Sequence, residues 1–324
     1  MSMRGAGGRV GWLVAGLLAT MAGLVTPAAA KVPVVVASIK PLHSLAASVM
    51  AGIGQPSLLI KGTASEHVYS MKPSDAALLA SADVVFWVGE PLETVLVRPL
   101  ANLPKSAHVV ALLDTPGLLR LHAREGGLWE PHEDEQESGV TDAGRQADHG
   151  QELDGHIWLD PENAKLIGAR MAEVLAAVDP ANAARYRENA AALAARIDAL
   201  EAELEPRLAA IANRPFIVFH DAYHYFERRF GLAGAGSITL NPAQPPGARR
   251  IAQIRDKLAA AGAVCVFHEP QFPSTLVNAV AEGTEARIGE LDPTGAAIPD
   301  GPDLYFQLLR DMTASLERCL APAR

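Results

Sequence analysis

The sequence of 324 residues contains only two cysteines, Cys265 and Cys319, and no strongly basic segment. Two cysteines cannot build the dense disulfide framework of a small secreted domain, nor any site that needs a cysteine cluster. The 28 basic side chains stand against 37 acidic ones, which gives a formal charge of -9, and 49% of the residues are hydrophobic. This composition excludes a disordered chain and a polybasic arm that binds nucleic acid.

Beyond residue 30 the sequence has no long apolar run, whereas the first thirty residues have the pattern of a secretory signal peptide. Arg4 and Arg9 precede an apolar run at residues 11–25, and three alanines at residues 28–30 precede Lys31. About 15 apolar residues fall short of the roughly 20 that a transmembrane helix needs. No cysteine at the cleavage site could carry a lipid. We therefore expect residues 1–30 to be removed and the protein to be soluble in the periplasm of a Gram-negative bacterium, an oxidising compartment.

Short apolar runs alternate with helical patterns in two parts of the chain, before residue 113 and after residue 212. Alternating strands and helices predict parallel sheets with right-handed crossovers. We therefore predict an α/β fold with two Rossmann-like lobes, at residues 31–178 and 213–324. The predicted strands are residues 32–37, 57–60, 83–88, 108–112, 216–219, 237–240, 264–267 and 287–291. The predicted helices of the lobes are residues 42–50, 74–81 with Ser74 as N-cap, 93–101, 223–230, 248–261, 274–282 and 304–319.

Between the lobes, helix-forming residues dominate at residues 163–178 and again at 181–211. The second piece contains no glycine, and no proline lies between Pro180 and Pro206. This predicts one long helix, about 45 Å at 1.5 Å per residue, that connects the lobes over residues 179–212. Two shorter helices are the alternative.

An acidic segment at residues 123–154 contains ten acidic side chains against Arg124 and Arg145, a balance of -8. It has little apolar periodicity, so we predict a flexible surface loop. The loop also contains His132 and His149. Two interpretations stay open, a solvating insertion or a low-affinity cation trap.

The two cysteines lie in a predicted strand and near the end of the last predicted helix. In an oxidising compartment they could form a bridge that stabilises the protein by about 4 kcal/mol in the chain-entropy model. Two buried free thiols are the alternative.

Three of the ten histidines, His67, His156 and His220, each lie at the end of a predicted strand or in a loop near that edge. Ligands of open α/β sheets bind at this edge, so three imidazoles could meet in one cleft. A single histidine is more often structural, and the His-Glu-x-x-His motif of zinc peptidases does not occur. The positions alone leave both interpretations open.

Five sets of segments run in order through essentially all of the chain after residue 30. They are Ser65-Glu66-His67 with Pro73-Ser74-Asp75, residues 83–89, residues 155–161, residues 219–223, and residues 269–272 with 291–293. Together they resemble the zinc-binding members of the metal-specific periplasmic binding proteins that serve ABC importers.

The resemblance implies that His67, His156 and His220 are three imidazole ligands of one Zn²⁺ ion. Glu66 and Asp292 correspond to positions where family members offer a carboxylate or leave room for water as the fourth ligand. Manganese-binding relatives carry a carboxylate at the position of His220, and imidazole suits zinc better than manganese. The resemblance also implies a disulfide between Cys265 and Cys319.

The function implied is capture of Zn²⁺ between the lobes and delivery to the membrane permease of a zinc ABC transporter. Zinc would be the transported ligand of a monomeric protein that is not an enzyme and binds no nucleic acid. Protonation of the imidazoles below about pH 6 should release it. We expect only a small movement of one lobe against the other.

Two other functions stay open. A zinc hydrolase would use Glu66, Asp221 or Glu269 as a base, and a metal-binding adhesin would share the same scaffold. Three further histidines, His43, His224 and His268, have no predicted partner. His224 would share a helix face with His220 if its helix began early enough.

Overall fold

The computed structural model describes residues 1–2, 31–124, 152–240, 242, 246–260 and 262–322. The fold described below is that of the unit Val32–Arg324. The predicted signal peptide and residues 125–151 of the predicted acidic loop lie outside the described residues. Within the described parts, none of the helices has the length and apolar character needed to cross a bilayer.

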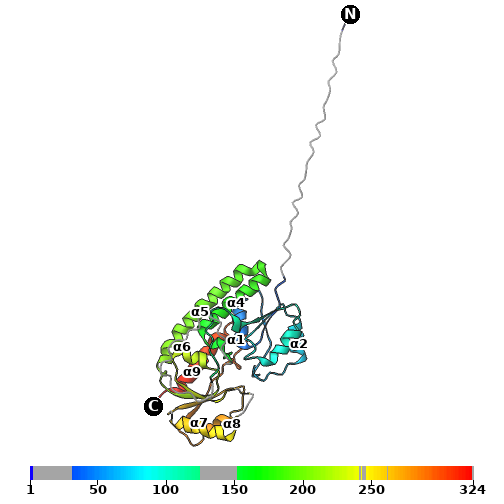
Figure 1. Cartoon of the computed structure of the whole chain (residues 1–324). Helices are drawn as coiled ribbons and strands as arrows, with labels where there is room; N and C mark the ends of the chain where they lie inside the picture. Colours follow the sequence, from blue (N-terminus) through cyan, green and yellow to red (C-terminus); the bar gives the residue numbers. More distant parts are fainter. Residues whose placement is uncertain (3–30, 125–151, 241, 243–245, 261, 323–324) are drawn as a thin grey trace, which may run out of the picture. The chain divides into compact units, whose positions relative to one another are not determined.

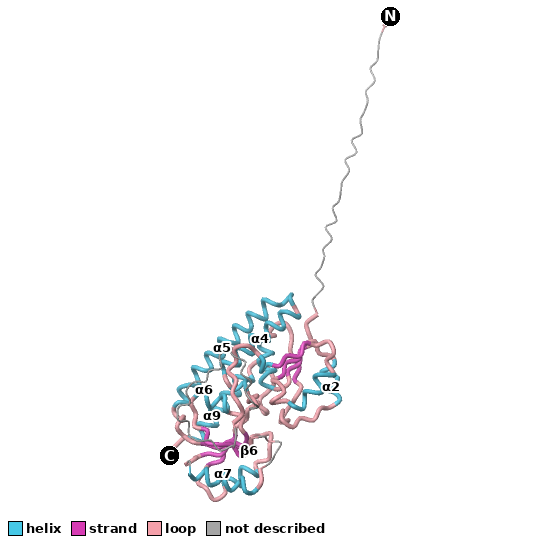
Figure 2. Tube along the Cα trace, viewed as in Figure 1, coloured by secondary structure: helices cyan, strands magenta, loops and turns pink. Residues whose placement is uncertain are grey.

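The N-terminal lobe contains a four-stranded parallel sheet in the order β2-β1-β3-β4. Strands are drawn in magenta in Figure 2. Its four strands confirm the four predicted runs and are β1 (Val35–Ala37), β2 (Ser57–Leu58), β3 (Val84–Trp87) and β4 (His108–Ala111). The connections contain α1 (Lys40–Val49), α2 (Pro73–Ala80), the 3₁₀ turn Thr94–Leu96 and α3 (Val97–Asn102). The turn Leu112–Asp114 follows β4.

The predicted N-cap of α2 is wrong by two residues. The helix begins at Pro73 with Lys72 as its N-cap, and Ser74 lies in the first turn. Proline suits the first helical position because its φ is already helical and it has no N–H to satisfy. The carboxylate of Asp75 accepts the backbone N–H of Lys72 at 2.9 Å, so an acidic residue closes this end of the helix.

The C-terminal lobe repeats the arrangement with a parallel sheet in the order β6-β5-β7-β8. The four predicted strands are confirmed as β5 (Phe216–His220), β6 (Gly234–Thr239), β7 (Cys265–His268) and β8 (Arg287–Glu290). The helices are α6 (His224–Phe230), α7 (Ala248–Ala260), α8 (Thr275–Ala281) and α9 (Leu304–Leu320). In each lobe the second strand lies on one side of the first strand, and the third and fourth strands lie on its other side. The crevice between β1 and β3 or between β5 and β7 is therefore the place for a ligand.

Strand β5 is buried on both faces, which explains its uninterrupted apolar run. Phe216 and Val218 belong to the large core that continues into the N-terminal lobe. Ile217 and Phe219 face a second core on the side covered by α7 and α8 (Figure 1).

The long connecting helix is confirmed as α5 (Ala183–Ala209), preceded by α4 (Pro161–Val178) and the 3₁₀ turn Pro180–Asn182. Its 27 residues span about 40 Å. Helix α5 packs along α4 and contacts α1 in the N-terminal lobe and α9 in the C-terminal lobe (Figure 1). Gly168 of α4 lets the two helices approach, because a Cβ there would lie 2.8 Å from Leu193 Cδ2. The helix therefore joins the lobes, while the predicted domain boundaries stay predictions.

A disulfide between Cys265 and Cys319 joins the start of β7 to the end of α9. This confirms the bridge and removes the alternative of two free thiols.

Candidate metal centre

The three predicted imidazoles converge. One ring nitrogen from each of His67, His156 and His220 lies within 4.8 Å of the other two. His67 comes from the loop between β2 and α2, His156 precedes the 3₁₀ turn Ile157–Leu159, and His220 ends β5. The rings are tilted or edge-on to one another, with centroids 5.6, 5.2 and 5.3 Å apart.

The ring of His156 is oriented by a buried carboxylate. Oδ1 of Asp154 lies 2.7 Å from Nδ1 of His156 and also accepts the backbone N–H of His156 at 2.9 Å. A carboxylate can only accept, so Nδ1 carries the proton and Nε2 keeps its lone pair.

The ring of His220 has the same arrangement. Nδ1 of His220 lies 2.6 and 2.8 Å from the two carboxylate oxygens of Glu269, whose side chain is buried. Glu269 directly follows β7, and β7 pairs with β5 in the sheet. Adjacent parallel strands therefore deliver the ligand and its carboxylate to the same edge.

The remaining nitrogens face one another. Nε2 of His156 and Nε2 of His220 are 3.3 Å apart, and Nε2 of His67 is buried with no hydrogen-bond partner in the described structure. Two lone pairs at this distance repel each other unless a cation lies between them. Zinc–nitrogen bonds of about 2.0–2.1 Å in tetrahedral geometry place two ligand nitrogens about 3.3–3.4 Å apart, so the donor set fits zinc.

The charges around the cluster favour a cation. Burial raises the pKa of the Glu66 carboxyl, whose Oε1 lies 3.8 Å from Nε2 of His67. Burial, with His220 and His156, holds the pKa of His67 well below its usual value, so its ring is neutral. At His220 burial opposes protonation, but Glu269, Glu66 and Asp221 together outweigh it and raise the pKa. A dication would give the buried carboxylates of Glu66 and Glu269 a positive partner.

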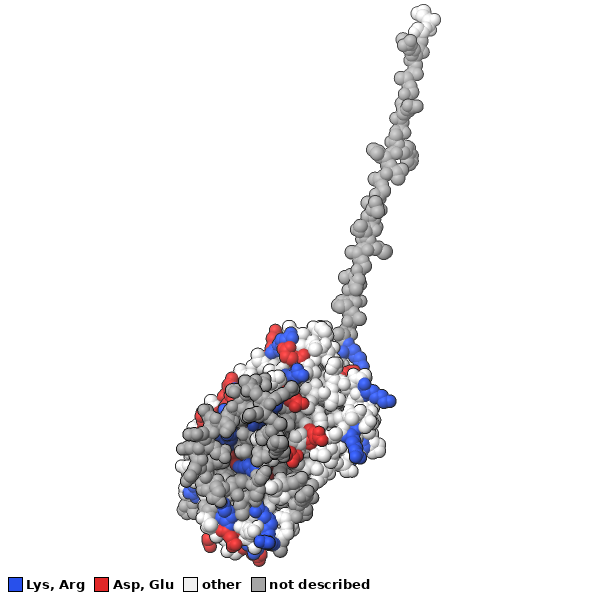
Figure 3. All heavy atoms as spheres, viewed as in Figure 1, with Lys and Arg blue, Asp and Glu red and all other residues white. Residues whose placement is uncertain are grey.

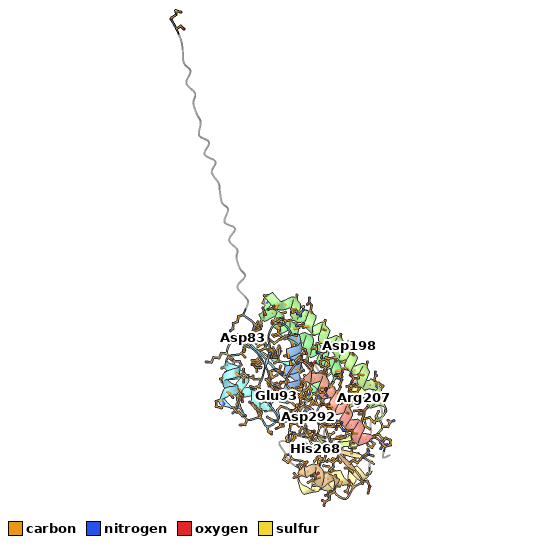
Figure 4. The ribbon with its side chains drawn as sticks, turned by 180° about the vertical axis from the view of Figure 1, so that it is seen from behind. Asp83, Glu93, Asp198, Arg207, His268 and Asp292 are labelled. Atoms are coloured by element: carbon orange, nitrogen blue, oxygen red, sulfur yellow. A yellow bond between two sulfur atoms is a disulfide. The ribbon has the colours of Figure 1, made fainter. Side chains whose placement is uncertain are left out.

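Asp292 is not one of the grouped ligands. Its Oδ1 accepts the backbone N–H groups of Thr294 and Gly295 and the side-chain amide of Gln271, at 3.0, 2.9 and 2.7 Å. Its Oδ2 accepts the N–H of Ala296 at 2.5 Å. The carboxylate of Asp292, which is labelled in Figure 4, thus organises the turn that follows β8. Its predicted role as a ligand stays untested.

The three histidines without predicted partners lie outside the cluster. Nε2 of His43 in α1 is 3.1 Å from the carbonyl oxygen of Pro56, and Nε2 of His268 is 3.8 Å from Glu290. The condition for a helix face shared by His220 and His224 is not met, because α6 begins at His224 and His220 belongs to β5. Nδ1 of His224 lies 3.9 Å from Asp154.

The two ends of the predicted acidic loop form part of the frame of the site. Leu153 pairs with His122 in an antiparallel bridge. The guanidinium of Arg124 binds both carboxylate oxygens of Asp221 and, at 2.7 Å, Glu227. The loop is therefore anchored where it leaves the fold.

Two residues of the site had no predicted role as partners. Asp154 counted as one acidic residue of the loop, and Glu269 as a candidate base. Their positions held a signal, since Asp154 lies two residues before His156 and Glu269 follows the strand next to that of His220.

A second acidic group lies on α4 and α5, where Glu162, Asp198 and Glu201 come together at the surface. The ammonium of Lys165 already binds Glu162 and Asp198 at 2.5 Å each. Figure 4 shows Asp198 on α5, away from Asp292. On the face drawn in Figure 3, basic and acidic side chains are interspersed.

Comparison with known proteins shows the family to which the chain belongs. The family described as "Zinc-uptake complex component A periplasmic" (ZnuA) matches residues 35–319. The chain belongs to the ZnuA family. It is 47% identical over 305 residues to the high-affinity zinc uptake system protein ZnuA of Brucella suis biovar 1, covering 89% of this chain and 91% of that protein. The protein of the same name from Haemophilus ducreyi is 36% identical, over 94% of this chain and 97% of its own length.

Solved structures of other proteins share the fold of this chain. A crystal structure of ZnuA superposes with a TM-score of 0.72 at 24% identity, covering 90% of this chain and 100% of that chain. A mutant of the laminin-binding adhesin from Streptococcus agalactiae superposes with a TM-score of 0.73 at 23% identity, over 89% and 99% of the two chains. At this level of identity both show the fold alone.

Proposed function

We propose that this protein captures Zn²⁺ with the Nε2 atoms of His67, His156 and His220 and delivers it to the membrane permease of an ABC importer. The observation that carries the proposal is the 3.3 Å separation between Nε2 of His156 and Nε2 of His220. In both rings Nδ1 is hydrogen-bonded to a carboxylate. Relatives named as high-affinity zinc uptake proteins support it.

In this proposal zinc is cargo, and the side chains only bind and release it. Asp154 and Glu269 keep two imidazoles in the tautomer that offers Nε2 to the ion. Glu66 is the proposed fourth ligand, because its buried carboxylate lies beside His67 and needs a positive partner. A water molecule is the alternative fourth ligand.

The compartment and the assembly belong to the same proposal. The basic and apolar pattern of residues 1–30 supports export to the periplasm, as the description of the family does. We propose that the carrier acts as a freely diffusing monomer.

The test is competitive zinc and manganese titration by native mass spectrometry, with wild type and His220→Glu. Imidazole favours zinc, so wild type should hold one zinc in the presence of equal manganese, and His220→Glu should lose much of this preference. The matched control is His268→Glu, at a histidine outside the cluster that should leave the preference unchanged. Equal or stronger manganese binding by wild type would remove the proposal.

A hydrolase would need a base beside the bound ion. Of the three candidates, Asp221 is held by Arg124 and Glu269 by His220. We expect no ester hydrolysis and no bicarbonate turnover by the zinc-loaded protein. Turnover that disappears in His220→Ala would show a catalytic role.

A further inference from the structure

One face of α1 carries three buried polar side chains at a spacing of four residues, Lys40, Ser44 and Ser48. All three hydrogen-bond to the segment that leads into α9, which we call the hub segment (residues 291–305). Lys40 Nζ donates to the carbonyl oxygens of Ala296 and Ile298 at 3.1 and 2.6 Å, Ser44 Oγ accepts the N–H of Tyr305 at 3.0 Å, and Ser48 Oγ donates to the carbonyl oxygen of Pro302 at 3.2 Å.

Lys40 is the least expected member of this stripe. An ammonium is costly to bury unless it is paired and hydrogen-bonded. Here its side chain is 7% exposed and also lies 3.2 Å from Asp300, whose side chain is half exposed. An ion pair with a half-exposed carboxylate contributes little, so the carbonyl groups of Ala296 and Ile298 are the main partners. Lys40 also opens α1 directly after β1, at the edge of the sheet where the cluster lies.

The hub segment also contacts the chain beside each carboxylate-bound ligand. Tyr223, three residues after His220, donates its hydroxyl to the carbonyl oxygen of Leu291 at 3.0 Å. Trp158, two residues after His156, donates its indole N–H to the carbonyl oxygen of Pro293 at 2.8 Å. Gln271, two residues after Glu269, binds Asp292.

We propose that Lys40 is a positioning residue for zinc retention. Its ammonium fixes the hub segment to the N-terminal lobe, and the hub segment in turn holds His156 and His220 beside His67. Asp292 takes part by bracing the turn that presents the two carbonyl groups to Lys40. This inference rests on the function proposed above, and it adds a residue that does not touch the ion.

A preformed cage lowers the ordering cost of binding, and differences in affinity between related variants lie mostly in the dissociation rate. Loss of the Lys40 bonds should therefore speed zinc release much more than it slows zinc capture.

The experiment measures zinc release by stopped flow from the full chain into excess chelator, with zinc alone as the probe. Lys40→Met should release zinc about tenfold faster while the association rate changes by less than about threefold. Lys40→Arg, which can still donate to both carbonyl groups, should recover most of the retention. The matched control Lys105→Met removes an exposed ammonium and should behave as wild type.

A release rate of folded Lys40→Met equal to that of wild type would overturn the inference. A lower melting temperature of the zinc-free variant without faster release would mean that Lys40 is merely structural, and would overturn it as well. Failure of wild type to bind zinc would instead remove the proposed function, so the two failures are distinguishable.

A second measurement on wild type keeps the inference testable if Lys40→Met does not fold. Zinc should slow hydrogen exchange of the Thr294, Gly295 and Ala296 amides, whose N–H groups donate hydrogen bonds to the carboxylate of Asp292. Exchange at these amides that does not respond to zinc would overturn the coupling.

Discussion

At the residue scale, the chemistry of the cluster depends on which nitrogen of each ring carries the proton. Glu269 fixes this for His220 and Asp154 fixes it for His156, so both rings offer Nε2 before an ion arrives. A carboxylate behind a ligand imidazole also makes the ring a stronger donor.

Glu269→Gln should weaken zinc affinity about 10- to 100-fold, because the neutral amide has only one acceptor oxygen and accepts the Nδ1–H of His220 more weakly than the carboxylate does. Isothermal titration with a competing chelator measures the change. Glu290→Gln, on the neighbouring strand with an exposed carboxylate, is the matched control and should keep wild-type affinity. Equal affinities for the two variants would show that Glu269 does not orient His220.

Glu93 gives a prediction on pH. It is fully buried, its carboxylate accepts the N–H of Val88 at 2.6 Å, and burial raises its pKa from 4.5 to about 7. The folded protein therefore holds this proton more tightly than the unfolded chain. The free energy of unfolding should fall by up to about 3 kcal/mol as the pH rises from 4.5 to 7, and then level off.

Glu93→Gln should remove that fall, because the side chain no longer ionises. Urea unfolding of the zinc-free protein at pH 5 and pH 8 measures the difference, and Glu90→Gln is the exposed control three residues away. The same pH dependence in wild type and Glu93→Gln would contradict the assignment.

The candidate site could be predicted in part. The three histidines stand at strand ends or in loops at that edge, so their meeting follows from the parallel sheets. Asp154 and Glu269 could not be assigned as their partners, since this requires knowing that β7 lies beside β5 and that the loop returns before His156. Asp292 stabilises a turn by accepting hydrogen bonds from three backbone N–H groups. The order of side chains in the sequence does not predict such backbone contacts.

At the scale of elements, the strands were predictable because both faces of a strand such as β5 are buried and the apolar run is therefore unbroken. Helix starts were less predictable, since they depend on local hydrogen bonds. Pro73 and Asp75 set the start of α2, and His220 continues β5 instead of joining the helix that begins at His224.

The disulfide ties two such elements together, and its removal gives an element-scale prediction. The double variant Cys265→Ser, Cys319→Ser opens a link across 54 residues, which corresponds to about 4 kcal/mol in the chain-entropy model. Denaturant unfolding should show a loss of about 2–4 kcal/mol, while zinc stoichiometry stays at one. Loss of tight zinc binding in a folded variant would show that the bridge also positions the β7 end of the site.

At the scale of the whole molecule, the lobes share one apolar core and are joined by α5 along its length. Hydrogen bonds from Lys40 of α1 and from Trp158 to carbonyl oxygens of the hub segment also connect the two lobes. A rigid pair of lobes fits the expectation of a small movement on binding, which stays a prediction.

The ends of the acidic loop are anchored to the fold, so the segment between them can be removed without disturbing Arg124 or Asp154. Replacing residues 125–151 by Asn-Gly, a turn that suits an antiparallel pair, should keep one tight zinc site, because Arg124 and Asp154 remain. Asp154→Asn in the full chain should weaken that site although the loop is present. Zinc titration of both variants checks this, and loss of the tight site in the deletion variant alone would show that the loop itself supplies a ligand.

The central claim is that three imidazole nitrogens from three segments bind one zinc ion. Anomalous diffraction at the zinc edge from crystals of the zinc-loaded protein tests it most directly. The account predicts one strong peak at about 2.0–2.1 Å from Nε2 of His67, His156 and His220. A principal zinc peak bound elsewhere, or bound by Nδ1 atoms of these rings, would contradict it.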